Sequence, residues 1–527
     1  MKPSAPAAQG GGLARRVALA ALLIAVGNIA SRVLGVVRES VIAGTFGRGA
    51  EVAAFTAASA IPTIVYDLLI NGAISAALVP VFSEYAEGDE QTFWRIASTV
   101  INLALIVVAL ATALLIWQAP LAVTVLAGGF EPAIQDTATG MVRWLLPSVV
   151  FMALSGLITA LLYARQRFLL PSFTTSAFNG GIILGALLLT PALGPFSLVA
   201  GVLAGAALQV LLQLPGLRDM AYRPVLDLRH PGVRRIMRLY APVALGIGFS
   251  VVGIVLDRNL ASRLEETAIP TMRYATTLIQ FPLGLVAAAV SFAVLPTLSR
   301  QASAGDEEAF RSTLAMGIKV VLLLILPAAA GLAALSTPIV ATVLERRQFT
   351  PQDTLATAQA LLLYLPGLPA AAIDQMLLFA FYAHKRTLAP NLVQGAAVGV
   401  YALTALGLLG LNLGVGALIL GNSAQWVAHM LILLVLARRL VRLGGLRLGE
   451  ALLKCGVASL VLAATAWGLA GLLQPHTGHL LQLIVAGGAA GVLYFGLCLL
   501  LRVEALDFFV DALRRRINMR NGLGVRN

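Results

Sequence analysis

Charged residues are scarce in this chain. Only 12% of its 527 residues are Asp, Glu, Lys or Arg, whereas soluble domains carry about 25%. Hydrophobic residues make up 59% of the sequence and its mean hydropathy is +0.89, more apolar surface than one soluble core can bury. The composition therefore excludes an ordinary soluble domain and indicates a protein that crosses a membrane many times.

Cysteine is almost absent as well. The only two, Cys455 and Cys498, fall in different apolar runs, so neither a disulfide framework nor a thiolate metal site is predicted. His476 and His479 lie close together but have no Cys, Asp or Glu beside them, and we expect no metal centre there. The sequence also lacks a phosphate-cradling glycine loop, a nucleophile elbow and paired catalytic carboxylates. We predict a protein that is not an enzyme and that needs no cofactor beyond a coupling sodium ion or proton.

Apolar runs of about 20 residues, each long enough for the hydrocarbon layer, follow one another along most of the chain. Lipid offers the backbone no hydrogen-bond partners, so such runs form helices or closed barrels. The runs are continuous rather than alternating, which excludes the barrel pattern. The sequence therefore predicts an all-α polytopic membrane protein with about fourteen transmembrane helices.

The net charge of +13 would suggest nucleic acid in a soluble protein, but here it lies in the connections between apolar runs. One alternate set of connections is rich in Lys and Arg, and its 218–238 connection alone holds six arginines. The opposite set has only Arg48, Arg263, Arg346 and Arg347. By the positive-inside rule, both termini are predicted to be cytoplasmic, with no nucleic-acid partner.

An internal repeat suggests how the helices are grouped. The stretch "SAALVPVFSEYAEGDEQTF" (75–93) recurs as "SFAVLPTLSRQASAGDEEAF" (291–310), six predicted spans later. An even offset gives both copies one orientation, as in transporters built from parallel repeats around a central cavity. The predicted domains are a cytoplasmic tail (1–16), an N-lobe of six helices (17–217), a cytoplasmic linker (218–235), a C-lobe of six helices (236–440), two further helices (441–502) and a basic cytoplasmic tail (503–527).

Ionisable residues inside predicted spans are the candidate site residues, because each costs about 3 kcal/mol or more when it faces lipid. Arg32, Arg38 and Glu39 lie in the first span, within "GNIASRVLGVVRESVIAG" (27–44). Two interpretations stay open: an arginine pair that binds a phosphate or pyrophosphate, or a span that ends near Val36 and leaves Arg38 and Glu39 as an interfacial pair. Asp67 is either a cavity carboxylate or a structural hydrogen-bond acceptor, and Asp374 presents the same choice.

Asp257, late in the seventh predicted span, is the candidate for ion coupling. It either coordinates Na⁺, relays a proton or pairs with the adjacent Arg258. Adjacent residues do not face each other on a helix, which weakens the third option.

Several stretches resemble one known family. "SRVLGVVRESVIAGTFG", "AAFTAASAIPTIVYDLLINGAISAALVPVFSEY", "RQRFLLPSF", "YATTLIQFPLGLVAAAVSFAVLPTLSR" and "FYAHKRTLAP" are similar to segments of the lipid II flippase family, MurJ/MviN, in the multidrug/oligosaccharidyl-lipid/polysaccharide exporter superfamily. The resemblance covers nearly the whole chain. It implies translocation of lipid II from the inner to the outer leaflet of the bacterial cytoplasmic membrane by alternating access, for peptidoglycan synthesis.

The resemblance also implies roles for individual residues. Arg32 and Arg38 match first-helix arginines associated with the lipid pyrophosphate, and Asp257 falls where some members have a sodium-associated aspartate. Several family charges are missing: "YATTLIQFP" has Thr277 and Gln280 in a segment where relatives carry acids and an essential arginine. Arg273 lies one turn before Thr277 on the same face, so we hypothesise that Arg273 supplies the missing cationic contact.

These departures keep alternatives open. The expected partners are lipid II or a similar undecaprenyl-pyrophosphate-linked glycan, membrane lipids and cell-wall synthesis machinery. The alternatives are an exporter of another polyprenyl-linked glycan or amphiphile, and a non-transporting scaffold of the cell-wall machinery. A membrane glycosyltransferase is disfavoured, because every predicted outer loop is short.

Overall fold

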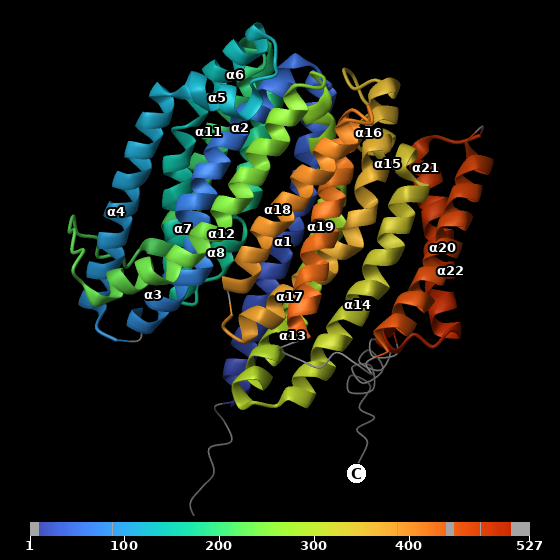
Figure 1. Ribbon diagram of the computed structural model, residues 1–527. Helices are drawn as coiled ribbons and strands as arrows, with labels where there is room; N and C mark the ends of the chain where they lie inside the picture. The colour runs from blue at the N-terminus through green and yellow to red at the C-terminus, as the bar shows by residue number, and fades with distance from the viewer. Residues whose placement is uncertain (1–9, 87, 387, 439–446, 475, 507–527) are drawn as a thin grey trace, which may run out of the picture. The chain divides into compact units, whose positions relative to one another are not determined.

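The structure is a computed structural model that describes residues 10–86, 88–386, 388–438, 447–474 and 476–506 (Figure 1). These residues form helices joined by short connections, and no β-strand occurs among them. The predicted all-α class is therefore confirmed. Most of the two predicted tails, residues 1–9 and 507–527, lies outside the described residues.

The chain packs as two units, Met1–Arg273 with Arg346–Phe349 (unit 1) and Tyr274–Glu345 with Thr350–Asn527 (unit 2). The helices of unit 1 are α1 (Gly10–Phe46), α2 (Ala50–Tyr66), η1 (Asp67–Asn71), η2 (Ile74–Leu78), α3 (Val79–Ala86), α4 (Glu90–Trp117), α5 (Ala119–Ala127), α6 (Pro132–Leu145), α7 (Ser148–Ala164), α8 (Leu169–Ser172), α9 (Thr174–Leu188), α10 (Thr190–Leu193), α11 (Phe196–Gln213), η3 (Leu214–Leu217) and α12 (Pro231–Ser262). Helix α13 (Ala268–Ala304) begins in unit 1 and continues into unit 2.

The remaining helices belong to unit 2. They are α14 (Glu307–Ala334), α15 (Ser336–Leu344), α16 (Pro351–Tyr364), η4 (Leu365–Gly367), α17 (Leu368–Ala383), α18 (Leu388–Leu409), α19 (Val415–Ala437), α20 (Leu448–Leu473), α21 (His479–Gln482), η5 (Leu483–Gly487) and α22 (Gly488–Leu500). The last two long helices, α20 and α22, pack side by side (red in Figure 1).

Ten of the described helices are long and apolar enough to cross a membrane. The count becomes eleven if α6 and α7, which meet at a 42° bend, form one span. This confirms a multi-span membrane protein, whereas the count of fourteen spans stays a prediction. The lobe boundaries also stay a prediction, and by its packing α12 belongs to unit 1.

The two copies of the sequence repeat lead into helices that begin in the same way. Asp89 caps the N-terminus of α4 by accepting hydrogen bonds from the backbone of Gln91 and Thr92, and Asp306 caps α14 by accepting from Ala309. Both helices are 28 residues long. An aspartate side chain is a strong N-cap because it satisfies backbone N–H groups that have no partner inside the helix. The "GDE" of each copy is therefore a helix start.

The first helix runs well past the charged motif. Helix α1 continues to Phe46 and is followed by Gly47 at φ +66°, a left-handed conformation that glycine adopts without strain. The segment Arg346–Phe349 docks against this end, where the Gln348 backbone N–H donates to the Gly44 carbonyl at 3.2 Å. Arg38 and Glu39 therefore lie inside a continuous helix, and where the membrane span ends along α1 stays a prediction.

Close packing of α9 against α11 fixes the position of α9 in unit 1. A Cβ atom on Gly181 would lie 2.3 Å from the Cα of Gly205, so only glycine permits this approach of the two backbones. Helix α9 also packs against α1. As a result, Asn179 on α9 lies next to the charged residues of α1.

Candidate functional site

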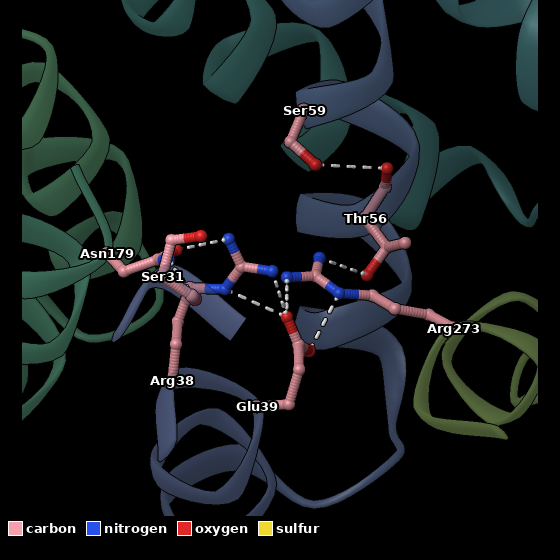
Figure 2. A network of polar contacts seen from close by, with 7 residues as sticks. All are labelled: Ser31, Arg38, Glu39, Thr56, Ser59, Asn179 and Arg273. Atoms are coloured by element: carbon pink, nitrogen blue, oxygen red, sulfur yellow. Dashed lines mark hydrogen bonds and ion pairs between the residues drawn. The ribbon is translucent and has the colours of Figure 1, made fainter. Parts of the chain in front are cut away.

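A carboxylate between two arginines forms the centre of the candidate site in unit 1 (Figure 2). Glu39 Oε1 accepts from Arg38 Nε at 2.9 Å and from Arg38 Nη2 at 2.6 Å. Arg273 Nη2 donates to the same oxygen at 2.8 Å, and Arg273 Nε donates to Glu39 Oε2 at 2.8 Å. Only 1% of the Glu39 side chain is exposed. We call Arg38, Glu39 and Arg273 the arginine cluster.

Two neighbouring helices hold the guanidinium groups in place. Arg38 Nη1 donates to Asn179 Oδ1 at 2.9 Å, and the Asn179 amide donates to the Ser31 carbonyl at 3.1 Å. On the other side, Arg273 Nη1 donates to the Thr56 hydroxyl at 3.2 Å, and the guanidinium lies over the Phe55 ring, 5.4 Å from its centroid. Helices α1, α2, α9 and the start of α13 therefore all contribute to the arginine cluster.

Arg38 and Glu39 pair although they are neighbours in sequence. Adjacent helical residues point about 100° apart, which argues against contact between short side chains. The arginine side chain is long enough to bend around the helix, and its planar fork then meets the carboxylate. The interfacial-pair interpretation named these two partners, and the structure adds that Glu39 is buried.

The arginine cluster carries two fixed positive charges and one negative charge. Burial of this single carboxylate is compensated by four charge-assisted hydrogen bonds. Glu39 thus holds two guanidinium groups close together that would otherwise repel each other. Among the described contacts, Arg38 uses three of its five N–H groups, and 23% of its side chain is exposed. The cluster is suited to binding an anionic oxygen through Arg38.

The other candidate residues lie apart from these contacts. Arg32 is on an exposed part of α1, and its pairing with Arg38 around a ligand stays a prediction. Asp67 begins the π-helical turn η1 and accepts from the Asn71 amide at 2.8 Å. Asp257 is half-buried in α12. Asp374 lies in unit 2 and shares a hydrogen bond with His429.

Sequence reasoning missed two polar partners. Asn179 holds Arg38, and its signal was one amide in an otherwise apolar span, "SAFNGGIILGALL". His429 pairs with Asp374, and its signal was a lone histidine within "AQWVAHMLILL". Neither residue lies near its partner in sequence, so the two pairings could be recognised only from the three-dimensional structure.

A polar cluster outside the spans joins the connection that follows α7 to the connection that follows α11. Arg167 Nη1 and Nη2 both donate to the Asp219 carboxylate at 2.8 Å, and Arg165 also donates to it. The side-chain hydrogen bond from Arg167 holds the pKa of Asp219 below its usual range, and the positive charge of Arg165 acts in the same direction. This cluster fixes the start of the connection between α11 and α12.

The fold and the buried ionic groups of its spans define a polytopic membrane transporter. A family model described as lipid II flippase MurJ matches residues 42–486, and the chain belongs to this family. The lipid II flippase MurJ of Burkholderia cenocepacia is 31% identical over 415 residues, which are 74% of this chain and 79% of that protein.

Two solved structures show the same fold. A lipid II flippase MurJ in an inward closed conformation matches with a TM-score of 0.77 and 24% identity, covering 91% of this chain and 99% of that chain. An inward-facing multidrug resistance MATE family transporter of the MOP superfamily matches with a TM-score of 0.65 and 13% identity, covering 79% and 95%. These structures confirm the fold, and the family model with the Burkholderia relative confirms the predicted family.

Proposed function

We propose that this protein translocates lipid II across the bacterial cytoplasmic membrane, from the inner to the outer leaflet, and does so by alternating access. Membership of the lipid II flippase family is the observation that supports this proposal most strongly. The predicted excess of Lys and Arg on one side supports an orientation with both termini in the cytoplasm.

Within this proposal, the arginine cluster binds the pyrophosphate of the lipid. A guanidinium group matches phosphate oxygens with two parallel N–H donors, and two held close together suit a pyrophosphate. Arg38 is the contact residue, since part of its side chain is exposed, and Glu39 is a positioning residue, since its oxygens are occupied by arginines. Arg273 then supplies the second cation, as the sequence comparison led us to hypothesise.

Complementation tests the function and the site together. The resident lipid II flippase of a host is depleted, this chain is expressed, and lipid II exposed on the outer leaflet is measured. We expect rescue by the parent protein and loss of rescue with Arg38→Ala or Arg273→Ala. Arg235→Ala is the matched control, because Arg235 forms an ion pair with Glu84 in which both side chains are more than half exposed.

The outcomes separate the alternatives. Rescue that survives both Arg38→Ala and Arg273→Ala contradicts the proposed site. Rescue that is lost only with Arg32→Ala would place the binding site at Arg32 of α1. Absence of rescue by a correctly inserted parent protein favours another polyprenyl-linked substrate or a scaffold of the cell-wall machinery. Coupling to Na⁺ at Asp257, proposed from the family resemblance, predicts that Asp257→Asn removes a sodium dependence of rescue.

A further inference from the structure

A hydrogen-bonded carboxylate–imidazole pair joins two membrane-spanning helices within unit 2. His429 of α19 and Asp374 of α17 approach to 2.7 Å between Nδ1 and Oδ1, with 9% and 16% of their side chains exposed. Both helices belong to candidate membrane spans. Ionisable residues inside a membrane are expensive and as a rule serve function, and His–Asp pairs recur in proton relays.

The pair lines a polar cavity of about 170 Å³. The lining residues are Ala371, Asp374, Gln394, Gln425, Trp426 and His429. Since one water takes about 30 Å³, the cavity has room for several. The two glutamine amides, the carboxylate and the imidazole provide the polar partners that such waters need, so a proton can reach the imidazole through this space.

Titratable side chains also lie on the helices that carry the pair or pack against it. On α17, Tyr382 lies within electrostatic reach of Asp374. From α14, Lys319 donates to Glu504 at 2.5 Å, and from α16 the ring of Tyr364 packs against Trp426 with centroids 6.3 Å apart. The exposed Glu307 and Glu308 lie in the first turn of α14, and α18 contributes an amide to the cavity.

We propose that His429 and Asp374 form a proton-binding site that couples proton movement to the transport cycle, an inference that rests on the proposed function. The ionised carboxylate accepts a hydrogen bond from Nδ1, which leaves Nε2 of the neutral imidazole as the acceptor. A hydronium ion gives its proton to Nε2 and leaves as water. The pair then changes from a net charge of −1 to zero.

The change in net charge provides the coupling. A neutral pair costs less to remove from water than a pair with an uncompensated charge, so proton binding favours the conformation in which the cavity is closed to solvent. Release of the proton from Nε2 to water on the other side reverses the preference. The site therefore favours different conformations before and after it binds a proton.

Trp426, in the wall of the same cavity, reports proton binding directly. In the full chain, Trp94, Trp117, Trp144 and Trp467 are replaced by Phe, so that Trp426 is the only fluorophore of its kind. We expect reversible quenching through a single transition as pH falls, because an imidazolium quenches a nearby indole more than a neutral imidazole does.

Three variants test the assignment of that transition. His429→Gln removes the transition, while His479→Gln, outside the cavity, preserves it. Asp374→Asn moves the midpoint of the fluorescence transition to lower pH, because the imidazolium loses its negative partner. If His429→Gln fails to fold, this shift still tests the proposed site. Absence of a transition in the parent, or its survival in His429→Gln, overturns the proton site.

Proteoliposomes with fluorescent lipid II test the coupling, with the membrane potential clamped. We expect a pH gradient to raise the flipping rate severalfold in the parent and to have no effect in His429→Gln. Equal flipping with and without the gradient, or stimulation by a Na⁺ gradient that needs Asp374, overturns the coupling. If the Trp426 transition is intact but the parent flips no lipid II under any condition, the proposed function fails and the proton site stands.

Discussion

The two units of this protein bury charge in different ways. In unit 1, Glu39 lies between Arg38 and Arg273, whose guanidinium groups stay charged at any physiological pH. In unit 2, Asp374 is paired with His429, whose imidazole can gain or lose a proton. Fixed positive charge suits a permanently anionic ligand, whereas a titratable partner suits a proton. The two proposals assign different functions to two buried carboxylates because their cationic partners differ.

The largest difference between the two sites should appear when the carboxylate is removed. Glu39→Ala leaves two arginines without their shared partner, and an unpaired buried charge costs about 3 to 5 kcal/mol. Thermal unfolding in detergent should show a large fall in the unfolding temperature or loss of folded protein. Stability equal to that of the parent would mean that Glu39 does not hold the arginines.

A smaller loss is expected when Arg38 loses its other partner. Asn179→Ala removes a hydrogen bond to a charged group, which is worth about 1.5 to 3 kcal/mol. The guanidinium keeps its contacts with Glu39, so lipid II flipping should fall less than with Arg38→Ala. The result is checked by flipping in proteoliposomes, with Asn102→Ala as the control, because Asn102 hydrogen-bonds the connection near Val225. Equal losses in the two asparagine variants would contradict a specific role of Asn179.

Removal of the unit 2 carboxylate should cost less than removal of Glu39. Asp374→Asn leaves a neutral His429 with a partner that can still accept a hydrogen bond, so we expect a cost of about 1 kcal/mol. Thermal unfolding of Asp374→Asn beside Glu39→Ala measures the contrast. A loss as large as that of Glu39→Ala would mean that His429 is locked in its charged form.

The smallest effect is expected outside the spans. The lowered pKa of Asp219 means that its interactions with Arg167 and Arg165 contribute stability above the ordinary aspartate pKa of about 3.9, which is lost as pH falls through the lowered value. Because the pair is largely exposed, Asp219→Asn should cost only a few tenths of a kcal/mol at pH 7. Unfolding measured at pH 7 and pH 3 should show that the difference between parent and variant shrinks at the lower pH. A difference that grows on acidification would contradict this sign.

Composition and apolar runs were enough to predict an all-α membrane protein, because lipid leaves the backbone few alternatives. The motif around Arg38 and Glu39 was likewise visible as charge inside a span. Arg273 and Glu39 are 234 positions apart in the chain. The sequence could not show that they are in contact, because the contact depends on how the helices pack. His429 was missed for the same reason: a lone histidine gains meaning from Asp374 on another helix.

Binding of lipid II to the purified protein tests the central claim most directly. Arg38→Ala and the control Arg235→Ala each remove one arginine, so they share the same change in net charge. The proposed site predicts that Arg38→Ala weakens binding by about tenfold or more, equivalent to about 1.4 kcal/mol, while Arg235→Ala binds like the parent. Equal affinity of the parent and Arg38→Ala for lipid II would contradict the assignment of the arginine cluster as the pyrophosphate site.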